Sequence, residues 1–163
     1  MVWFAPRWRV RLAPRPLLLL LAALLILAPA AGAPPPAGRA AGVALTVRVT
    51  GLRNDRGQVA VALFDSAAHF PKQERALRGQ VVRIAGKRAQ VTFRDLQPGT
   101  YAVAILHDEN QNQKMDFNFL GMPLEGYGFS NDASALFGPP SFERAAFRLL
   151  PRASGISING RYF

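Results

Sequence analysis

Val43-Ala44-Leu45-Thr46-Val47-Arg48-Val49-Thr50 is the stretch that decides the fold class. Its apolar residues recur at every second position, and a period of two is typical of a half-buried β-strand. Gly51 ends the stretch, and the turn-forming cluster Asn54-Asp55-Arg56-Gly57 follows it. The same period returns in Val59, Val61 and Leu63, so we expect a second strand ending near Asp65 and a hairpin between the two.

Further strands follow at intervals of about 8 to 12 residues, with turn signals between them. They are predicted over residues 81–84, 89–94, 101–108, 145–149 and 156–158. Residues 67–77 break the alternation and are predicted to form a loop with one helical turn, and residues 108–141 form a long irregular stretch. The pattern predicts an all-β fold, an antiparallel sandwich of about seven strands of the immunoglobulin-like or transthyretin-like kind.

The first 33 residues have the pattern of a secretory signal peptide. The start is basic and contains Arg7, Arg9, Arg11 and Arg15. An apolar run over residues 17–31 follows, and small residues then offer cleavage near Ala33, or after Ala30. An uncleaved membrane anchor is the alternative, although a spanning helix needs about 20 apolar residues. We expect export to the periplasm or secretion, with a signal helix over 1–33, a Pro/Gly/Ala linker over 34–42 and a β-sandwich domain over 43–163.

Composition limits the chemistry of the exported part. The sequence has no cysteine, which excludes disulfides, thiolate catalysis, zinc–thiolate sites and a lipoprotein anchor. Residues after Ala33 hold 16 basic and 10 acidic side chains, so their net charge is +6 rather than the +10 of the whole chain. The basic residues alternate with apolar ones instead of forming a stripe, so we expect no nucleic-acid partner. The charge also favours weak attraction to anionic envelope surfaces.

A polar loop after the strand at 101–108 resembles a calcium-binding loop in its spacing. Asp108, Asn110, Asn112 and Asp116 stand at positions 1, 3, 5 and 9, and calcium takes oxygen ligands from alternate residues of a tight loop. Position 6 is Gln113 instead of the glycine that the sharp turn requires, and position 12 is Phe119 instead of a bidentate glutamate. The alternative is a polar turn whose side chains bond their own backbone.

Aromatic residues are dense in the irregular stretch, where glycines interrupt them. Tyr127, Phe129 and Phe142 are the candidate contacts for a ligand or partner. The alternative is that these rings fold back and cover an open end of the sandwich, because a domain without disulfides needs the buried apolar area.

Catalytic motifs are not evident in the sequence. No nucleophile elbow, HExxH motif, phosphate loop or dinucleotide fingerprint occurs. A hydrolase of unrecognised type would have to use His107, Asp108 and Glu109, within the segment 107–116. His69 lies in a polar loop and is expected to be solvated.

Several motifs occur together along the chain. They are Val49-Thr50-Gly51-Leu52-Arg53-Asn54 with Gly57, Leu63-Phe64-Asp65, the segment from Leu96 to His107-Asp108-Glu109-Asn110, Glu125-Gly126-Tyr127-Gly128-Phe129-Ser130-Asn131, and Phe137-Gly138-Pro139-Pro140-Ser141-Phe142. In this combination, the chain from about Val43 to Ile158 resembles domain-of-unknown-function family 2141. The resemblance implies an exported bacterial β-sandwich protein. It also implies a loop of the form Asp-x-Asn-Gly-Asn-Gly-Lys-x-Asp, in which this chain has Gln111 and Gln113 in place of the glycines.

A second, weaker resemblance concerns the segment Leu96-Gln97-Pro98-Gly99-Thr100-Tyr101. It is similar to transthyretin-like and collagen-binding-B-like sandwich domains, an analogy at the level of fold. Together these observations favour a non-catalytic binding or structural module of the bacterial envelope. We expect it to be a monomer and to bind an envelope or extracellular ligand, either a glycan or a protein. We expect it to contact the membrane only through its leader, and to use no cofactor, with calcium at the 108–116 loop as the exception left open. The hydrolase using residues 107–116 is the alternative function.

Overall fold

The computed structural model describes residues 42–134 and 138–163, so the predictions for the signal peptide and almost all of the linker lie outside the described residues. Eight strands are present there: β1 (Val43–Thr50), β2 (Gln58–Phe64), β3 (Arg78–Arg83), β4 (Ala89–Leu96), β5 (Gly99–Asp108), β6 (Gly126–Phe129), β7 (Phe147–Leu149) and β8 (Ser154–Asn159). Three short helical segments accompany them: η1 (Gln73–Arg75), η2 (Ser130–Asp132) and α1 (Phe142–Ala145). Within these described residues, no helix has the length and hydropathy needed to cross a membrane.

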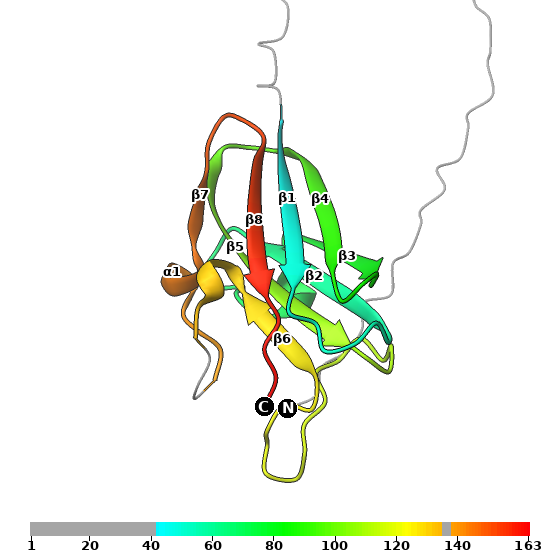
Figure 1. The fold of residues 1–163 in the computed structure, drawn as a ribbon. Helices are drawn as coiled ribbons and strands as arrows, with labels where there is room; N and C mark the ends of the chain where they lie inside the picture. The colour runs from blue at the N-terminus through cyan, green and yellow to red at the C-terminus, as the bar shows by residue number, and fades with distance from the viewer. Residues whose placement is uncertain (1–41, 135–137) are drawn as a thin grey trace, which may run out of the picture.

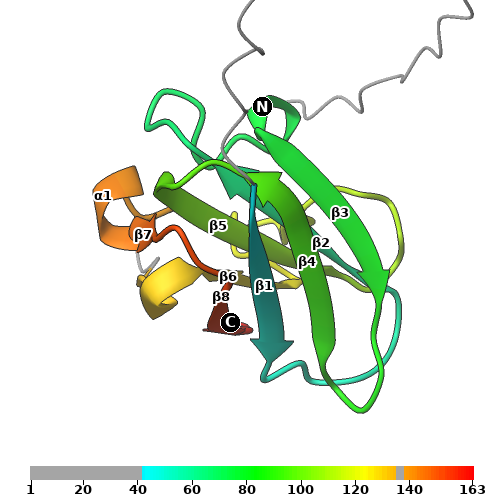
Figure 2. The same cartoon turned by 90° about the horizontal axis from the view of Figure 1, so that it is seen from above.

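The strands form two sheets that pack face to face (Figures 1 and 2). The smaller sheet has the order β4-β1-β8, and the larger has the order β3-β2-β5-β6 with β7 paired to one end of β5. This arrangement confirms the predicted all-β sandwich.

Three details of the strand arrangement differ from the sequence-based expectation, and a fourth difference concerns Ala145, described below. The hairpin between the first two strands is wrong, because β1 and β2 lie in different sheets and residues 51–57 cross between them. The pairing is not wholly antiparallel, since β8 runs parallel to β1. Strand β6 lies inside the stretch predicted to be irregular. Two strands with the same apolar period bury equally well in one sheet or in facing sheets, so periodicity alone does not settle their pairing.

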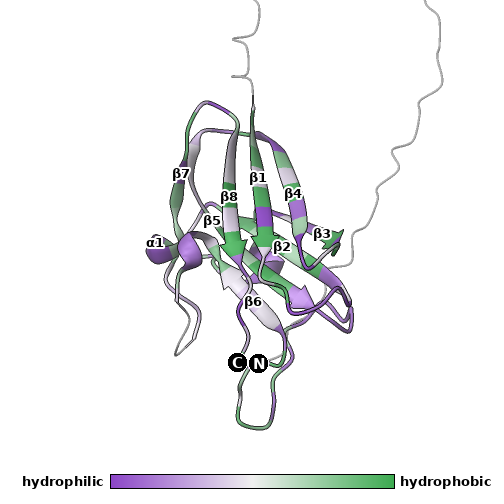
Figure 3. Cartoon of the chain, in the orientation of Figure 1, coloured by the Kyte–Doolittle hydropathy of each residue, from purple (hydrophilic) through white to green (hydrophobic). Residues whose placement is uncertain are grey.

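The main core lies between the two sheets and follows directly from the alternation in the sequence. In β1 the side chains of Leu45, Val47 and Val49 are fully buried, while the residues between them face outward. They pack with the inward residues of the larger sheet, such as Val61 and Val103. In Figure 3 this alternation is seen along β1, where green, hydrophobic segments are interrupted by purple ones.

A second cluster covers part of the outer face of the larger sheet. Phe70, from the loop after β2, makes edge contacts with the rings of Phe64, Phe129 and Phe142, at centroid distances of 5.3, 5.8 and 5.9 Å. Ala145 belongs to this cluster and ends helix α1, so its predicted place at the start of the next strand is wrong. These rings cover one end of the outer face of the larger sheet. The loop between β5 and β6 lies next to the other end.

Strand β6 pairs with β5 and needs glycine at its two inward positions. A Cβ on Gly126 would lie 2.5 Å from ring carbons of Tyr162, and one on Gly128 would lie 2.9 Å from a methyl group of Ile158. The C-terminal segment therefore runs beside β6, where Tyr127 and Arg161 exchange backbone hydrogen bonds, and its Tyr162 ring lies over Gly126.

Candidate functional site

The loop after β5 begins at Asp108, whose side chain is fully buried. Its two carboxylate oxygens accept hydrogen bonds from the backbone N–H groups of Asn112 (3.0 Å) and Gln113 (2.9 Å). The side-chain amide of Gln58 donates a third hydrogen bond at 2.8 Å. Asp108 thus folds the chain back on itself at the position where β5 ends.

The other predicted loop residues do come together. Asp116 accepts hydrogen bonds from the side-chain amides of Asn110 and Asn112, at 2.6 Å and 3.0 Å for its Oδ2 atom. The Asn110 and Asn112 side-chain oxygens accept backbone N–H groups two residues further on. This is the hydrogen bonding expected of a polar turn that satisfies its own backbone.

The backbone of this loop has positive φ angles at the two positions where the family's loop has glycine. Gln111 and Gln113 have φ angles of 62° and 60°, in the left-handed region that glycine enters most easily. No group of three or more His, Cys, Asp or Glu side chains converges as a metal-binding set within residues 42–134 and 138–163. The loop is held by amide and carboxylate groups that bond one another.

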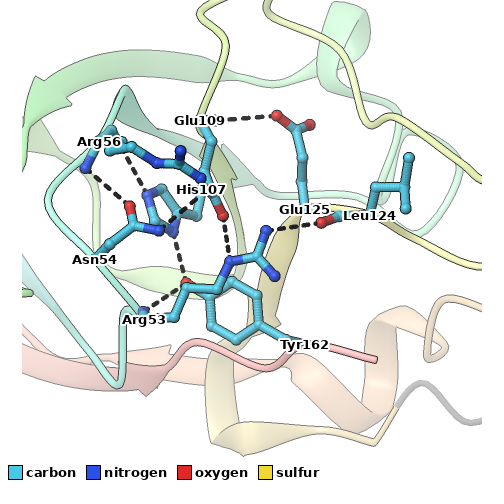
Figure 4. A network of polar contacts seen from close by, with 8 residues as sticks. All are labelled: Arg53, Asn54, Arg56, His107, Glu109, Leu124, Glu125 and Tyr162. Carbon is cyan, nitrogen blue, oxygen red and sulfur yellow. Dashed lines mark hydrogen bonds and ion pairs between the residues drawn. The ribbon is translucent and has the colours of Figure 1, made fainter.

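Glu125, which precedes β6, closes the loop from the other side (Figure 4). It is buried, and its two oxygens accept the backbone N–H groups of Glu109 at 3.0 Å and Asp116 at 3.3 Å. Burial, with a contribution from the charges of Asp108 and Asp116, raises its pKa in spite of these hydrogen bonds. A single carboxylate therefore joins the two ends of the segment 109–116.

Glu109 joins the same loop to the crossing between the sheets. Its carboxylate accepts hydrogen bonds from Arg53 (2.5 Å), Asn54 (3.1 Å) and Arg56 (2.8 Å). Burial alone would raise its pKa, but these hydrogen bonds outweigh it and lower the pKa to about 2. A general acid needs a pKa near the working pH, so Glu109 is poorly suited to that role.

His107 is fully buried, and both of its ring nitrogens have internal partners. Nε2 lies 2.9 Å from the carbonyl oxygen of Arg56, which can only accept, so Nε2 carries a proton. Nδ1 lies 2.6 Å from the hydroxyl of Tyr162, which in turn accepts the backbone N–H of Arg53 at 3.1 Å. Figure 4 shows this chain of hydrogen bonds tying the C-terminal segment to the sheet-crossing loop.

These contacts bear on the hydrolase alternative. His107, Asp108 and Glu109 each direct their polar atoms toward protein partners, and no buried side-chain nitrogen or oxygen among the described residues lacks a hydrogen bond. The observed geometry gives these three residues the role of connecting loops and lends no support to catalysis.

An apolar groove lies on the outer face of the larger sheet, next to the same loop. Its volume is about 450 Å³. Strand pairing places Ala62 opposite Ala104 and Ala60 opposite Leu106, and directly paired residues share one face of a sheet. These four residues line the groove, and small alanine side chains on adjacent strands leave the floor low.

Longer side chains form the walls of the groove. They come from the loop between β5 and β6, from β6 itself and from the C-terminus, and include Met115, Phe117, Met122, Tyr127, Phe129 and Phe163. The rings of Tyr127 and Phe163 stack at a centroid distance of 5.8 Å. Among the described lining side chains, Gln73 and Tyr127 alone carry amide or hydroxyl groups, so the groove is suited to an apolar occupant.

The three aromatic residues predicted as a ligand surface have different positions. Tyr127 and Phe129 line the groove, Tyr127 as a half-buried wall and Phe129 as a buried one. Phe142 is half-buried in the ring cluster around Phe70 and is not among the groove-lining residues.

The groove floor and the clamp formed by Glu125 are not among the residues predicted from the sequence. The floor had a usable signal, because Val59-Ala60-Val61-Ala62-Leu63 and Tyr101-Ala102-Val103-Ala104-Ile105 both alternate large residues with alanine. The contact between His107 and Tyr162 joins residues that are 55 positions apart, and no local pattern announces it.

Comparison with known proteins places this fold and loop in a family. The family model described as "Uncharacterized protein conserved in bacteria (DUF2141)" matches residues 47–156, more than half of the chain. The chain belongs to this family. The match covers the second half of β1, strands β2 to β7 and the first residues of β8, including the loop clamped by Glu125 and most of the groove. Comparisons with curated proteins and with solved structures found no match.

Proposed function

We propose that this protein is an exported, non-catalytic binding module that holds an apolar group in the groove of its larger sheet. The observation that carries the proposal is the groove itself, about 450 Å³ of space over an alanine floor with aromatic and methionine walls. Binding sites for small molecules have volumes of about 300 to 1,000 Å³ and are lined mainly by apolar side chains.

The side chains that line the groove favour an apolar occupant over a glycan. A sugar needs several hydrogen-bonding groups around its hydroxyls, and the described lining offers Gln73 and the Tyr127 hydroxyl. An acyl chain or the aromatic side chain of a partner needs only contact area. The alanines support this reading, because a larger residue at position 60, 62 or 104 would fill the space.

The polar network serves the groove indirectly in this proposal. Glu125 and Glu109 hold the ends of the loop whose later residues, Phe117 and Met122, form one wall. The hydrogen-bonded His107 and Tyr162 fix the C-terminal segment, which ends in the stacked ring of Phe163. A wall built on satisfied buried hydrogen bonds is held in one arrangement before any ligand arrives.

The test is a titration with N-phenyl-1-naphthylamine, a neutral dye whose fluorescence rises in apolar surroundings. The protein is expressed with its own leader in an exporting bacterial host and purified in the released form. We expect saturable binding that Ala104→Leu weakens strongly, because the added side chain occupies the groove.

The matched control is Ala153→Leu, the same change at an exposed turn residue away from the groove. It should bind the dye as the wild type does, and thermal melting should show that both variants fold. Equal binding by Ala104→Leu and the wild type would contradict the proposal.

A further inference from the structure

Exposed apolar side chains are concentrated at one end of the domain. Nine large hydrophobic residues are exposed among the described residues, and six of them lie in one place. Five belong to the loop between β5 and β6, and the sixth is the C-terminal residue beside it: Phe117, Phe119, Leu120, Met122, Leu124 and Phe163. Phe119 is 94 % exposed and Leu120 is 71 % exposed, so the tip is the most exposed part. A patch of this kind marks an interaction surface.

The loop projects from the domain as a short hairpin, drawn in yellow in Figure 1 and with a green, hydrophobic tip in Figure 3. Phe117 and Pro123 form an isolated antiparallel bridge, flanked by a hydrogen bond from Leu124 N–H to the carbonyl of Asp116. The guanidinium of Arg53 donates to the carbonyl of Leu124 at 3.1 Å. The base is therefore fixed to the polar network, and the tip is held away from the body of the protein.

Most backbone N–H groups at the tip have partners within the loop. Asn118 is responsible, since its side-chain oxygen accepts the N–H groups of Leu120 and Met122, both at 2.9 Å. Its carbonyl accepts the N–H of Gly121, and its own N–H donates to the carbonyl of Met122. Backbone groups that enter an apolar medium must find partners within the protein, and the N–H donors of Leu120, Gly121 and Met122 have such partners here, while the carbonyls at the very tip can remain at the level of the hydrated headgroups.

Charge identifies the kind of surface that the tip would meet. Six carboxylates accept hydrogen bonds inside the protein, namely Asp55, Asp108, Glu109, Asp116, Glu125 and Asp132. Arg53 and Arg56 alone form ion pairs among the basic residues in the described part of the chain, and Lys114 is exposed near the start of the loop. Hydrogen bonding leaves these carboxylates charged, but the chain after Ala33 has 16 basic and 10 acidic side chains, and its net charge of +6 attracts anionic lipid and opposes association with a second copy of the chain.

We infer that residues 117–124 dock on an anionic lipid bilayer, with Phe119 and Leu120 entering the boundary between headgroups and acyl chains. Aromatic and aliphatic side chains on a fixed, internally bonded tip suit that boundary, and the positive domain supplies long-range attraction. This contact goes beyond the leader, and it does not require the groove to be occupied.

The test is co-sedimentation of the released protein with phosphatidylcholine vesicles that contain or lack phosphatidylglycerol. The wild type should bind the anionic vesicles, less so at high salt. The double variant Phe119→Ser with Leu120→Ser should bind about tenfold more weakly or worse, because two side chains lose their burial. Leu150→Ser, at an exposed residue outside the patch, should bind as the wild type does.

A second measurement uses the Phe119→Trp variant. The only tryptophans of the chain are Trp3 and Trp8, inside the predicted signal peptide, so the released form would report from position 119 alone. Its emission should shift to the blue with anionic vesicles, and the emission of a Leu150→Trp variant should not shift.

Vesicle binding that the double serine variant retains at the wild-type level would overturn the inference. Failure of the wild type to bind the anionic vesicles would also overturn it. That outcome includes the case in which sedimentation equilibrium shows that the loop mediates dimers instead. Dye binding in the groove is measured without vesicles, so either proposal can fail alone.

Discussion

Tyr162→Phe removes a single hydroxyl group and leaves the rest of the C-terminal contact in place. The ring would still lie against Gly126 and under the guanidinium of Arg53, 4.8 Å from the ring centroid. The hydroxyl accepts the N–H of Arg53 and meets Nδ1 of His107 at 2.6 Å. Because His107 is fully buried, water cannot replace the hydroxyl without a rearrangement.

The expected cost follows from the group left without a partner. A buried polar atom that loses its hydrogen bond costs about 1 to 3 kcal/mol, whereas the more exposed N–H of Arg53 can be hydrated. We therefore expect the free energy of unfolding to fall by about 2 kcal/mol. For a domain of this size, a change of 1 kcal/mol moves the melting temperature by about 4 °C, so Tm should fall by about 8 °C.

Urea unfolding of the released protein, followed by circular dichroism, measures this change in free energy. An unchanged m value would show that the variant loses stability without a change in the surface exposed on unfolding. Tyr127→Phe is the matched control, because its hydroxyl makes no hydrogen bond to the described part of the chain, and we expect a change below about 0.5 kcal/mol. Equal stability of the two variants would refute the role given to the His107–Tyr162 contact.

Three further predictions concern the same end of the molecule. Gly126→Ala should destabilise the domain by about 1 to 3 kcal/mol in urea unfolding, because its Cβ would lie 2.5 Å from the Tyr162 ring, whereas Gly79→Ala, with open space around it, should not. The pKa of Glu109 is lowered from 4.5 to about 2, so its carboxylate stabilises the fold fully above pH 4.5 and this contribution is lost as the pH falls toward 2. Glu109→Gln should therefore lower stability at pH 6 more than at pH 3, and an equal loss at both would contradict that assignment. Calcium at millimolar concentration should leave Tm unchanged, because Asp108 and Asp116 already accept N–H groups, and a clear rise would show that the loop binds the ion.

The strands could be predicted where a period of two dominates the sequence. Residues 43–50 and 101–108 alternate clearly, and they form the central strands β1 and β5 of the two sheets. Strand β6 could not be predicted in this way, because Gly126-Tyr127-Gly128-Phe129 has glycine where an inward apolar residue would stand. Those glycines are explained by Tyr162 and Ile158, which approach them only in the folded chain.

The candidate site was predictable only where it depends on a local sequence pattern. The polar loop 108–116 has a local pattern, and its four predicted residues form one hydrogen-bonded unit. Glu125 joins the loop from outside that pattern, and the groove depends on the register between β2 and β5. A single alanine carries no signal, whereas the alternation of alanine with larger residues in β2 and β5 does, and Ala62 opposite Ala104 forms part of the groove floor once that register is fixed.

The central claim is that the outer face of the larger sheet holds an apolar group, and alanine methyl groups report on it most directly. Two-dimensional ¹H–¹³C spectra of the released protein, titrated with N-phenyl-1-naphthylamine, would follow Ala60, Ala62 and Ala104 on the groove floor together with Ala89 in the core between the sheets. We expect the three floor methyl signals to shift together and saturate, while the Ala89 signal stays in place. Floor signals that remain unchanged while the dye binds would place the ligand elsewhere and contradict the claim.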